Sequence, residues 1–509
     1  MTFNFEDLFI FDLANNHQGD LNHAENIISK VSKICFDAKV NGCIKFQFRD
    51  LDHFIHKDHL QNSKNKHIPR FLSTKLPLED FRVLKKRIVD GGLLTCCTPF
   101  DEKSVENIVS MNFDILKVAS CSAQDWPLLE EVARANLPVI FSTGGQNLNN
   151  IDDLVSFFEH RGVDFAIMHC VSMYPTPLKN CNLDMIDTLK NRYGSKVIGW
   201  STHEDPREIL PLQVAYSKGA RIFERHIGMT KKNVNLNKYS SEPKQVEKWI
   251  EAYLRVKEVC GKKEKDIQEN EAVSIEELER GIYAKRNLKK GNLLSLDDVY
   301  FAMPRTKSQL KSGLFSDQLK LREDIKIDKP INVNSVVFKK KNDVQIIKNL
   351  IHEIKAMLNS ANIILDSSFE VEYSHHDGIK NFKKTGATII NCINREYCKK
   401  IIIQTPNQKH PAHYHKRKEE TFQILSGELE VYIDGKKRIL NPGDTCLIQP
   451  GVWHSFQTTK GCIFEEISTT HFNDDSFYKD KKINSMKREN RKTIVNHWGR
   501  FELFDKISS

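Results

Sequence analysis

Short apolar runs alternate with longer amphipathic stretches through the first half of the chain, from Leu8 to about Cys260. The apolar runs have the length and composition of buried strands, and the stretches between them repeat apolar residues at helical spacing. Eight strand–helix units predict a parallel sheet, and eight is the number of strands that closes as a (β/α)8 TIM barrel. A doubly wound open sheet is the competing fold. We favour the barrel because polar and glycine residues cluster after the carboxyl ends of the strands, where a barrel has its catalytic face.

The expected elements of this α/β domain, residues 1–262, follow from the pattern. The predicted strands are LFIFDLA, GCIKFQF, LLTCC, ILKVAS, PVIFS, DFAIMHC, KVIGWS and RIFERH. The predicted helices are His23–Lys39, Leu78–Val89, Lys103–Met111, Trp126–Ala135, Ile151–His160, Leu183–Asn191, Pro206–Lys218 and Pro243–Val259.

The rest of the chain is expected to form two smaller domains. Gly261–Ser274 is charged and poor in apolar residues, which predicts a linker. Arg280–Lys340 contains two short strand-plus-turn units and is typical of a small, mostly irregular module. An amphipathic helix at Val344–Leu358 precedes alternating strands from Phe369 to His471, which predict a small all-β barrel. The expected boundaries are 275–340 and 343–509, and we interpret the basic tail from Lys479 as a covering segment without chemistry.

Composition narrows the possible functions. Of 509 residues, 39% are hydrophobic and 28% are charged, which is typical of a folded multi-domain protein. The net charge of +9 is weak support for anionic substrates. The sequence lacks a basic stripe with interleaved aromatic residues, so it gives poor support for nucleic-acid binding. The sequence contains no run of about 18 apolar residues, the length that a membrane-spanning helix requires. Acidic residues near the start argue against an export signal. The 12 cysteines lack the spacing of a disulfide framework, so we expect a cytoplasmic protein.

Polar side chains follow the predicted barrel strands at their carboxyl ends. His203 and His226 end GWSTH and FERH, and this pair of imidazoles favours a divalent metal, although either histidine alone is more often a core or surface residue. Lys45 and Lys117, with several hydroxyl residues around them, are the groups that a phosphate monoester requires. A metal held by only two histidines keeps open positions and can polarise a carbonyl as a Lewis acid.

Short motifs in this half occur in an order that resembles the sialic acid synthase family. CTPF, LKVAS, STGG, HCVSMYPTP, GWSTH and FERH carry the resemblance, which extends from about Phe9 to Lys340. It implies condensation of phosphoenolpyruvate with an aldehyde sugar to a nonulosonic acid, with His203 and His226 as manganese ligands. It also implies that phosphoenolpyruvate is held by Lys45, Thr98, Lys117, Ser120, Ser142, Ser172 and Ser201.

Further roles follow from the same resemblance. Gln47 and Tyr174 would face the sugar, and Glu224 would lie near the metal and water. The carboxylates of Asp12 and Glu224 are the expected general base or metal-orienting groups. Arg280–Lys340, through RNLKKGNLLSLDDV, resembles the antifreeze-like domain of this family. In the family that domain reaches across to the other subunit's active site, which implies a homodimer.

The sequence departs from the family's pattern at several positions. Asp12 stands where the family usually has glutamate, and Ser172 where it usually has asparagine. A common aspartate is replaced near Asn235 or Asn237, and Met303 stands where an arginine contacts an N-acetyl group. These differences leave phosphoenolpyruvate binding expected and the sugar open.

The all-β segment contains a second group of residues with metal-ligand character. HPAHYHKRKEE supplies His413, His415 and Glu420, and PGVWH supplies His454. Alternation along a strand places His413 and His415 on one face, so that three imidazoles and a carboxylate can reach one Zn, Mn, Fe or Ni ion. The two motifs resemble those of the cupin family, with Asn407 where the first often has glycine.

Within the cupins, HYHKRKEE and FEEISTTHFNDDS resemble the D-lyxose isomerase type. An isomerase needs a metal that binds two sugar oxygens while a carboxylate moves a proton, a role open to Glu420, Glu465 or Glu466.

Two interpretations of the whole chain follow from these observations. The first is a nonulosonic acid synthase with a sugar-handling cupin, acting on phosphoenolpyruvate and an aldose (an amino sugar or its phosphate), with Mn²⁺ or a similar ion in the barrel and a second divalent ion in the cupin. The alternative is a cupin-type metal-dependent sugar isomerase, or a sugar-binding protein, with a degenerate synthase barrel.

Overall fold

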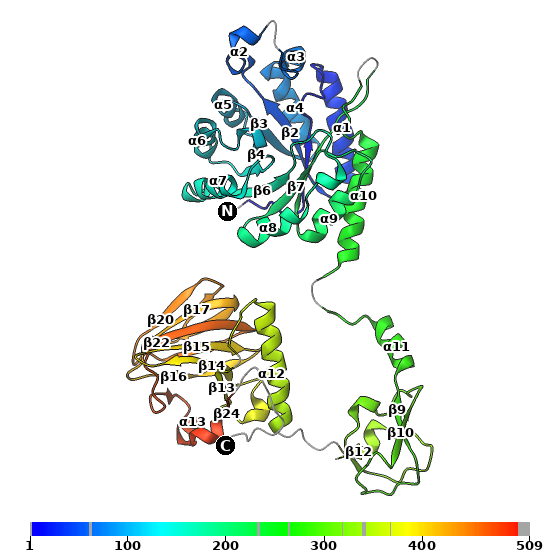
Figure 1. Ribbon diagram of the computed structural model, residues 1–509, viewed down its shortest axis with the longest axis vertical. Helices are drawn as coiled ribbons and strands as arrows, with labels where there is room; N and C mark the ends of the chain where they lie inside the picture. The colour runs from blue at the N-terminus through cyan, green and yellow to red at the C-terminus, as the bar shows by residue number, and fades with distance from the viewer. Residues whose placement is uncertain are drawn as a thin grey trace. The chain divides into compact units, whose positions relative to one another are not determined.

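The computed structural model describes residues 3–60, 64–231, 235–262, 265–317, 319–337, 343–366 and 368–496. The chain divides into two compact units, Met1–Asp266 and Ile267–Ser509 (Figure 1). Among the described residues, no helix is both long enough and apolar enough to span a bilayer.

The first unit is a closed barrel of eight parallel strands surrounded by helices (Figure 1). Each strand pairs with its neighbour in sequence, and β1 also pairs with β8, which closes the barrel. The predicted fold class is therefore confirmed, and the open sheet is excluded. The strands are β1 Leu8–Asp12, β2 Asn41–Phe48, β3 Leu94–Pro99, β4 Ile115–Val118, β5 Val139–Ser142, β6 Phe165–Cys170, β7 Ile198–Thr202 and β8 Ile222–His226. The helices around them are α1 Leu21–Ala38, α4 Leu78–Asp90, α5 Glu102–Ser110, α6 Trp126–Arg134, α7 Leu148–His160, α8 Asp184–Arg192, α9 Leu210–Lys218 and α10 Pro243–Cys260, with α2 Leu51–Phe54, η1 Lys57–His59 and α3 Ile68–Ser73 between β2 and α4.

The inward face of the barrel changes from apolar to polar along the strands. Leu8 and Ile10 belong to a buried apolar cluster with residues of the other strands, such as Ile115 and Ile222. Because side chains alternate along a strand, the next inward position of β1 after Ile10 is Asp12. The apolar end closes the barrel, and the polar end presents chemical groups where barrel enzymes have their active sites.

Helix α9 begins at Leu210, four residues after the predicted start at Pro206. The reason is Arg225, whose buried guanidinium donates to the carbonyl oxygens of Pro206 (3.3 Å) and Glu208 (3.0 Å). The same group forms a buried ion pair with Glu204, at 3.0 Å. These contacts fix the segment after His203 as a loop, so the helical pattern there does not become a helix.

The second unit starts with a helix inside the segment for which the sequence predicts a linker. Helix α11 spans Glu269–Leu278, and acidic residues in its first turn favour a helix amino terminus. Arg305, whose side chain is 5% exposed, pairs with Glu276 and Glu279 and so attaches the helix to the small module that follows. This module contains two antiparallel pairs, β9 Gly281–Ala284 with β10 Val299–Ala302 and β11 Lys320–Leu321 with β12 Val336–Val337.

The predicted all-β barrel is present as two antiparallel sheets. Helix α12, Asp343–Ser360, packs on the first sheet through Ile347, Leu350 and Ile354, in the place predicted for it. The turn Asp434-Gly435 has positive φ at both residues, which suits the hairpin between β18 and β19. The first sheet contains β20 Thr445–Ile448, β17 Glu420–Gly427, β22 Cys462–Thr469, β15 Tyr397–Gln404, β14 Ala387–Asn394, β13 Glu370–Ser374 and β24 Lys492–Val495, in this order. The second contains β19 Lys436–Leu440, β18 Leu429–Ile433, β21 His454–Gln457, β16 Lys409–Tyr414 and β23 Phe477–Tyr478.

The tail after Lys479 is more than a covering segment. After the short helices α13 Lys481–Ser485 and α14 Arg488–Arg491, it forms β24, which pairs with β13 and extends the first sheet. Arg488 and Lys492 of this tail line the cavity described below, so whether the tail takes part in chemistry there stays a question for experiment.

Candidate functional sites

Two lysines and two carboxylates form a buried ion-pair network at the polar end of the barrel. Lys45 Nζ lies 3.0 Å from Asp12 Oδ2 and 2.7 Å from Glu224 Oε1. Lys117 Nζ lies 3.5 Å from Glu224 Oε2, and none of the four side chains is more than 5% exposed. They come from β1, β2, β4 and β8, so the sequence prediction that these distant residues meet at one mouth agrees with the geometry.

This network keeps its members ionised. Burial raises the pKa of Glu224, but the charges of Lys117 and Lys45 outweigh burial and hold that pKa well below its usual range. Burial lowers the pKa of Lys45, whereas Asp12 and Glu224 raise it above its usual value. Two ammonium groups and two carboxylates therefore balance, and an incoming phosphate or carboxylate group would compete with Glu224 for the lysines.

The two predicted metal ligands of the barrel lie beside this network. The rings of His203 and His226 are 5.3 Å apart, and His226 Nε2 is 3.6 Å from Asp12 Oδ2. His203 Nδ1 lies 3.1 Å from the carbonyl oxygen of Val171, which fixes the proton on Nδ1 and leaves Nε2 as an acceptor. Burial lowers the pKa of both histidines, that of His203 to about 3, so both are neutral, as metal ligands must be. Two imidazoles beside a carboxylate fit a divalent ion.

Hydroxyl groups predicted to hold phosphoenolpyruvate surround Lys117. Its ammonium group donates to Ser142 Oγ, and Ser120 Oγ accepts from the amide of Gly144 at 3.0 Å. A Cβ atom at Gly144 would lie 2.2 Å from Ser172 Oγ, so only glycine lets these two loops approach. Ser201 and Thr98 are also buried at this end of their strands, and within the described chain Thr98 Oγ1 has no hydrogen-bond partner.

The residues predicted to face the sugar occupy different positions. Gln47 Nε2 donates to Asp12 Oδ2 at 3.0 Å, so Gln47 orients the carboxylate as well as lining the mouth. The Tyr174 ring lies 4.3 Å from that of His203, and Tyr174 is 54% exposed. Tyr174 therefore forms a wall of the mouth above the imidazoles.

Two further residues of this mouth were not predicted from the sequence. The Arg49 guanidinium lies 4.2 Å from the ring of Phe71 and 3.6 Å from that of Phe100, and it donates to Gln47 Oε1 at 3.1 Å. Its position in KFQFR, two residues after Gln47 on the same strand face, was the available signal. Tyr239 lies 5.2 Å from His226 and 5.3 Å from Tyr174, ring to ring. It comes from the irregular loop after β8, where no periodic signal exists.

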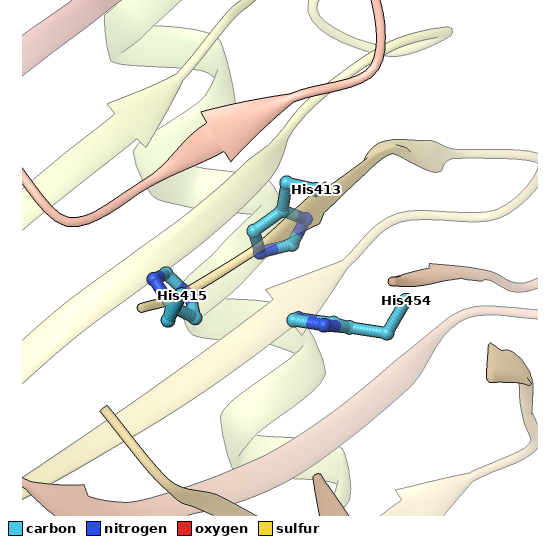
Figure 2. Close-up of side chains that lie close together, drawn as sticks. All are labelled: His413, His415 and His454. Atoms are coloured by element: carbon cyan, nitrogen blue, oxygen red, sulfur yellow. The ribbon is translucent and has the colours of Figure 1, made fainter. Parts of the chain in front are cut away.

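The predicted cupin ligands converge on one point (Figure 2). Ligand nitrogens of His413, His415 and His454 lie within 4.8 Å of one another. Each Nδ1 faces a backbone carbonyl oxygen, of Pro411 at 3.0 Å, Asp475 at 2.6 Å and Val452 at 3.1 Å respectively. These bonds favour the tautomer with the proton on Nδ1, which makes Nε2 of each ring available as a metal ligand.

Glu420 completes this group. Its Oε1 is 3.3 Å from His415 Nε2, and its Oε2 is 3.2 Å from His454 Nε2. Lys418 contacts Glu420 and lies 2.8 Å from Glu466, so Lys418 is a buried ion-pair partner, whereas Lys416 is exposed. Burial raises the pKa of Glu420, but Lys418 and His415 lower it well below its usual value. Three imidazoles and one carboxylate fit Zn, Mn, Fe or Ni.

A cavity of about 340 Å³ lies over this group. Glu466 faces the cavity, while its neighbour Glu465 pairs with Lys399 away from it. The tail contributes Arg488 and Lys492, which pair with Glu372 at 3.1 and 2.7 Å. These tail residues were missed because their partner lies far away in the sequence.

Comparisons with known proteins find a family match for the barrel and another for the all-β domain. A model described as the NeuB family matches residues 33–265, and a cupin-domain model matches residues 401–464. An uncharacterized protein of Methanocaldococcus jannaschii is 34% identical over 57% of this chain and 82% of its own length. The N-acetylneuraminate-9-phosphate synthase of Drosophila melanogaster is 29% identical over 64% of this chain and 95% of its own. The N,N'-diacetyllegionaminic acid synthase of Campylobacter jejuni is 26% identical over 57% and 87%.

A solved structure agrees with these relatives. A Chromobacterium violaceum protein described as spore coat polysaccharide biosynthesis protein E is 38% identical, with a TM-score of 0.64. The match covers 65% of this chain and 100% of that one. The barrel with its two histidines, the family match and these relatives lead to one conclusion: the chain belongs to the NeuB family, whose members here include sialic and legionaminic acid synthases, and it carries a cupin domain as well.

Proposed function

We propose that the barrel condenses phosphoenolpyruvate with an aldose, an amino sugar or its phosphate, to form a nonulosonic acid. The observation that carries the proposal is the single mouth at which Lys45, Lys117 and Glu224 meet His203 and His226. Buried ammonium groups beside neutral imidazoles suit an anionic substrate next to a divalent ion. We also propose, by family resemblance, a homodimer in which the 275–340 module is an antifreeze-like domain.

The chain's own residues would divide the reaction between them. Lys117, with Ser142, and Lys45 would bind the anionic groups of phosphoenolpyruvate and stabilise the phosphate as it leaves. A divalent ion such as Mn²⁺, held by His203 and His226, would supply Lewis-acid polarisation of the aldehyde. The enol carbon then attacks the aldehyde carbon, whose oxygen takes up a proton and becomes a hydroxyl. Water attacks the resulting cationic carbon and gives up a proton, and the bond between this carbon and the phosphate oxygen breaks as phosphate leaves.

The carboxylates would supply the proton acceptor for that water. In the free protein both lysines hold Glu224 ionised and weakly basic. When a substrate anion takes over hydrogen bonds from Lys45 and Lys117, Glu224 becomes more basic and can accept a proton. Asp12, fixed by Gln47 and by the amide of Ala14 at 2.8 Å, would orient groups around His226.

The test is phosphate release from phosphoenolpyruvate in the presence of Mn²⁺ and candidate aldoses. His226→Ala should abolish release, while His413→Ala and the exposed control His160→Ala should retain it. Release lost in His413→Ala but kept in His226→Ala would overturn the proposal.

A second candidate activity is metal-dependent sugar isomerisation by the cupin. It is favoured by the three imidazoles and Glu420 under a cavity of about 340 Å³ that also contains Glu466. Glu466 would move a proton between neighbouring sugar carbons, and an ion held by the three imidazoles would supply Lewis-acid polarisation of the sugar carbonyl. Deuterium incorporation from D₂O at C2 of an aldose, lost in Glu466→Gln with metal content unchanged, would support it. Elemental analysis without bound metal at either site would favour a sugar-binding scaffold instead.

A further inference from the structure

We propose that the cupin cavity binds an anionic, polyhydroxylated sugar derivative, a sugar acid or a sugar phosphate ester, in preference to a neutral aldose. The inference rests on the proposed divalent ion at His413, His415 and His454. It specifies the charge of the ligand, which the cupin resemblance does not.

The first argument is the charge balance of the cavity wall. Four carboxylates and four cationic side chains line it: Glu370, Glu372, Glu420, Glu466, Lys400, Lys418, Arg488 and Lys492. Their formal charges cancel. The three imidazoles add no charge when they bind an ion through Nε2, since a metal-bound histidine is neutral and its Nδ1 here is bonded to a backbone carbonyl. A divalent ion therefore leaves two positive charges uncompensated in a largely buried space, and a ligand with negative charge relieves that cost.

The second argument is a lysine with spare hydrogen-bonding capacity. Glu466 Oε1 is 2.8 Å from Lys418 Nζ but 3.5 Å from Lys400 Nζ. The Lys400 side chain is only 6% exposed and lines the cavity, and its 3.5 Å contact with Glu466 leaves hydrogen-bonding capacity at Nζ for a group in the cavity. Lys400 is therefore the cation best placed to donate to a ligand anion without breaking a close protein ion pair.

The third argument concerns the hydroxyl groups of the ligand. Asn391, Asn473 and Ser476 line the same cavity and offer amide and hydroxyl groups. His471 also lines it, and within the described residues its buried Nδ1 has no hydrogen-bond partner. Asn394 holds the backbone of His471 by two hydrogen bonds, of 2.9 and 3.1 Å. A buried, unpartnered nitrogen in a fixed position, surrounded by polar groups, suits a ligand rich in hydroxyls.

The chain offers a matched control for Lys400. Its neighbour on β15, Lys399, also pairs with a glutamate of β22, Glu465, but on the face of the sheet away from the cavity. Lys399→Gln and Lys400→Gln therefore remove the same charge from adjacent positions of one strand. Only the second change should affect a ligand in the cavity.

The experiment is isothermal titration of the full chain loaded with Mn²⁺, using two pairs of probes. D-gluconate is compared with sorbitol, and D-glucose 6-phosphate with D-glucose. We expect at least one anion to bind about tenfold more tightly than its neutral counterpart, the contribution of a charged hydrogen bond. Lys400→Gln should remove this preference and Lys399→Gln should retain it. The better anion of the two identifies the carboxylate or the phosphate ester as the recognised group.

Two outcomes overturn the inference. In the first, the neutral probes bind as tightly as the anions. In the second, Lys400→Gln leaves the preference for anions unchanged, which would mean that the anion binds elsewhere, such as in the barrel. Metal analysis of the same samples separates this failure from that of the proposed metal site. If His413→Ala does not lower the metal content, the metal site itself is wrong. If metal is present and neutral probes win, only the charge assignment fails.

Discussion

The barrel and the cupin hold their histidines in different ways. In the barrel, His203 is fixed through Nδ1 by a backbone carbonyl, whereas Nδ1 of His226 has no hydrogen-bond partner among the described residues. In the cupin, all three imidazoles are fixed in this manner. Since such bonds set the tautomer and orientation of an imidazole, the three cupin histidines are each held in one orientation, whereas in the barrel only His203 is held in this way.

Their surrounding charges differ too. The barrel sets two lysines and two carboxylates beside its histidines, four charges that balance in close ion pairs, so an anion could bind there only by competing with Glu224 for the lysines. In the cupin, the wall is balanced and the ion itself would create the surplus of positive charge. This difference is what we expect if, as proposed, the first site is organised around a phosphate and the second around a metal. Each prediction below alters one site and reads out both.

The largest effect is expected for Lys117→Met. Removing one preorganised charge where the phosphate leaves should lower phosphate release from phosphoenolpyruvate by about 10²–10³-fold. The cupin should keep its full metal content, measured by elemental analysis. Lys86→Met, on the exposed side of α4, is the control and should leave both readouts unchanged. A Lys117→Met protein with normal release would contradict a phosphate-centred barrel.

Next in size is Arg225→Met, which tests how the barrel positions its ligands. Arg225 lies between Glu224 and His226 and points outward to Glu204, with both side chains 1% exposed. The change leaves Glu204 buried without its partner, which costs about 3–5 kcal/mol. Hydrogen exchange of the 198–226 peptides should accelerate, while peptides of the cupin should not change.

The double variant Arg225→Met with Glu204→Leu provides the control. Replacing a buried ion pair by apolar groups is far less costly than breaking it, so exchange should return most of the way to its original rate. If the double variant exchanges as fast as the single one, the lost loop bonds to Pro206 and Glu208 matter more than the ion pair.

Arg225 and its neighbours on β8 also show how much of the barrel site could be predicted from the sequence. Alternation in FERH places Glu224 and His226 on the inward face of the strand and Arg225 on the outward face. The eight strand–helix units predict a closed barrel, so the residues at the ends of its strands could be predicted to lie together. The pairing of Arg225 with the loop after His203 is a tertiary contact without a periodic signal. For the same reason the late start of α9 and the presence of Tyr239 were missed.

The cupin gives the same lesson. The three histidines that its motifs predict as metal ligands lie on or next to strands, and the structure brings them together. Lys492 lies on the last described strand, and its partner Glu372 lies on the first strand of that sheet, which only the strand pairing brings together. Likewise α11 has few apolar residues, and its ion pairs to Arg305 cannot be read from local composition.

A smaller effect is expected from pH through Glu372. Burial raises the pKa of Glu372, but Lys492 outweighs burial and the pKa falls to about 2. A carboxylate with a depressed folded-state pKa stabilises the fold above its unfolded value, near 4.5, and this stabilisation is lost as the pH falls toward 2. The loss should be about 3 kcal/mol in the cupin.

Thermal unfolding of chelator-treated protein between pH 5 and pH 2 measures this effect without interference from metal loss. Glu372→Gln should be less stable at pH 5 and should flatten the pH dependence. Glu465→Gln, on the outer face of β22, should retain the dependence because Glu372 is still present. If the pH dependence of stability in Glu372→Gln were unchanged, other carboxylates would control the stability of the cupin in acid. Hydrogen exchange of barrel peptides should not change in either variant.

The smallest effect is expected at Tyr239, which sharpens the comparison at the level of ring contacts. Its ring lies 5.2 Å from His226 and 5.3 Å from Tyr174, so the two tyrosines wall the open mouth above the histidines. In the cupin, Tyr478 lies 5.4 Å from His413 and lines the cavity but is only 5% exposed. Tyr239→Ala should raise the KM for the sugar about fivefold, since ring contacts are worth roughly 1 kcal/mol, and leave the KM for phosphoenolpyruvate within about twofold. Tyr239→Phe keeps the ring and should behave as the unaltered protein. Equal increases for both substrates would mean that this wall shapes the whole mouth, and the division of the barrel into a phosphate side and a sugar side would have to be abandoned.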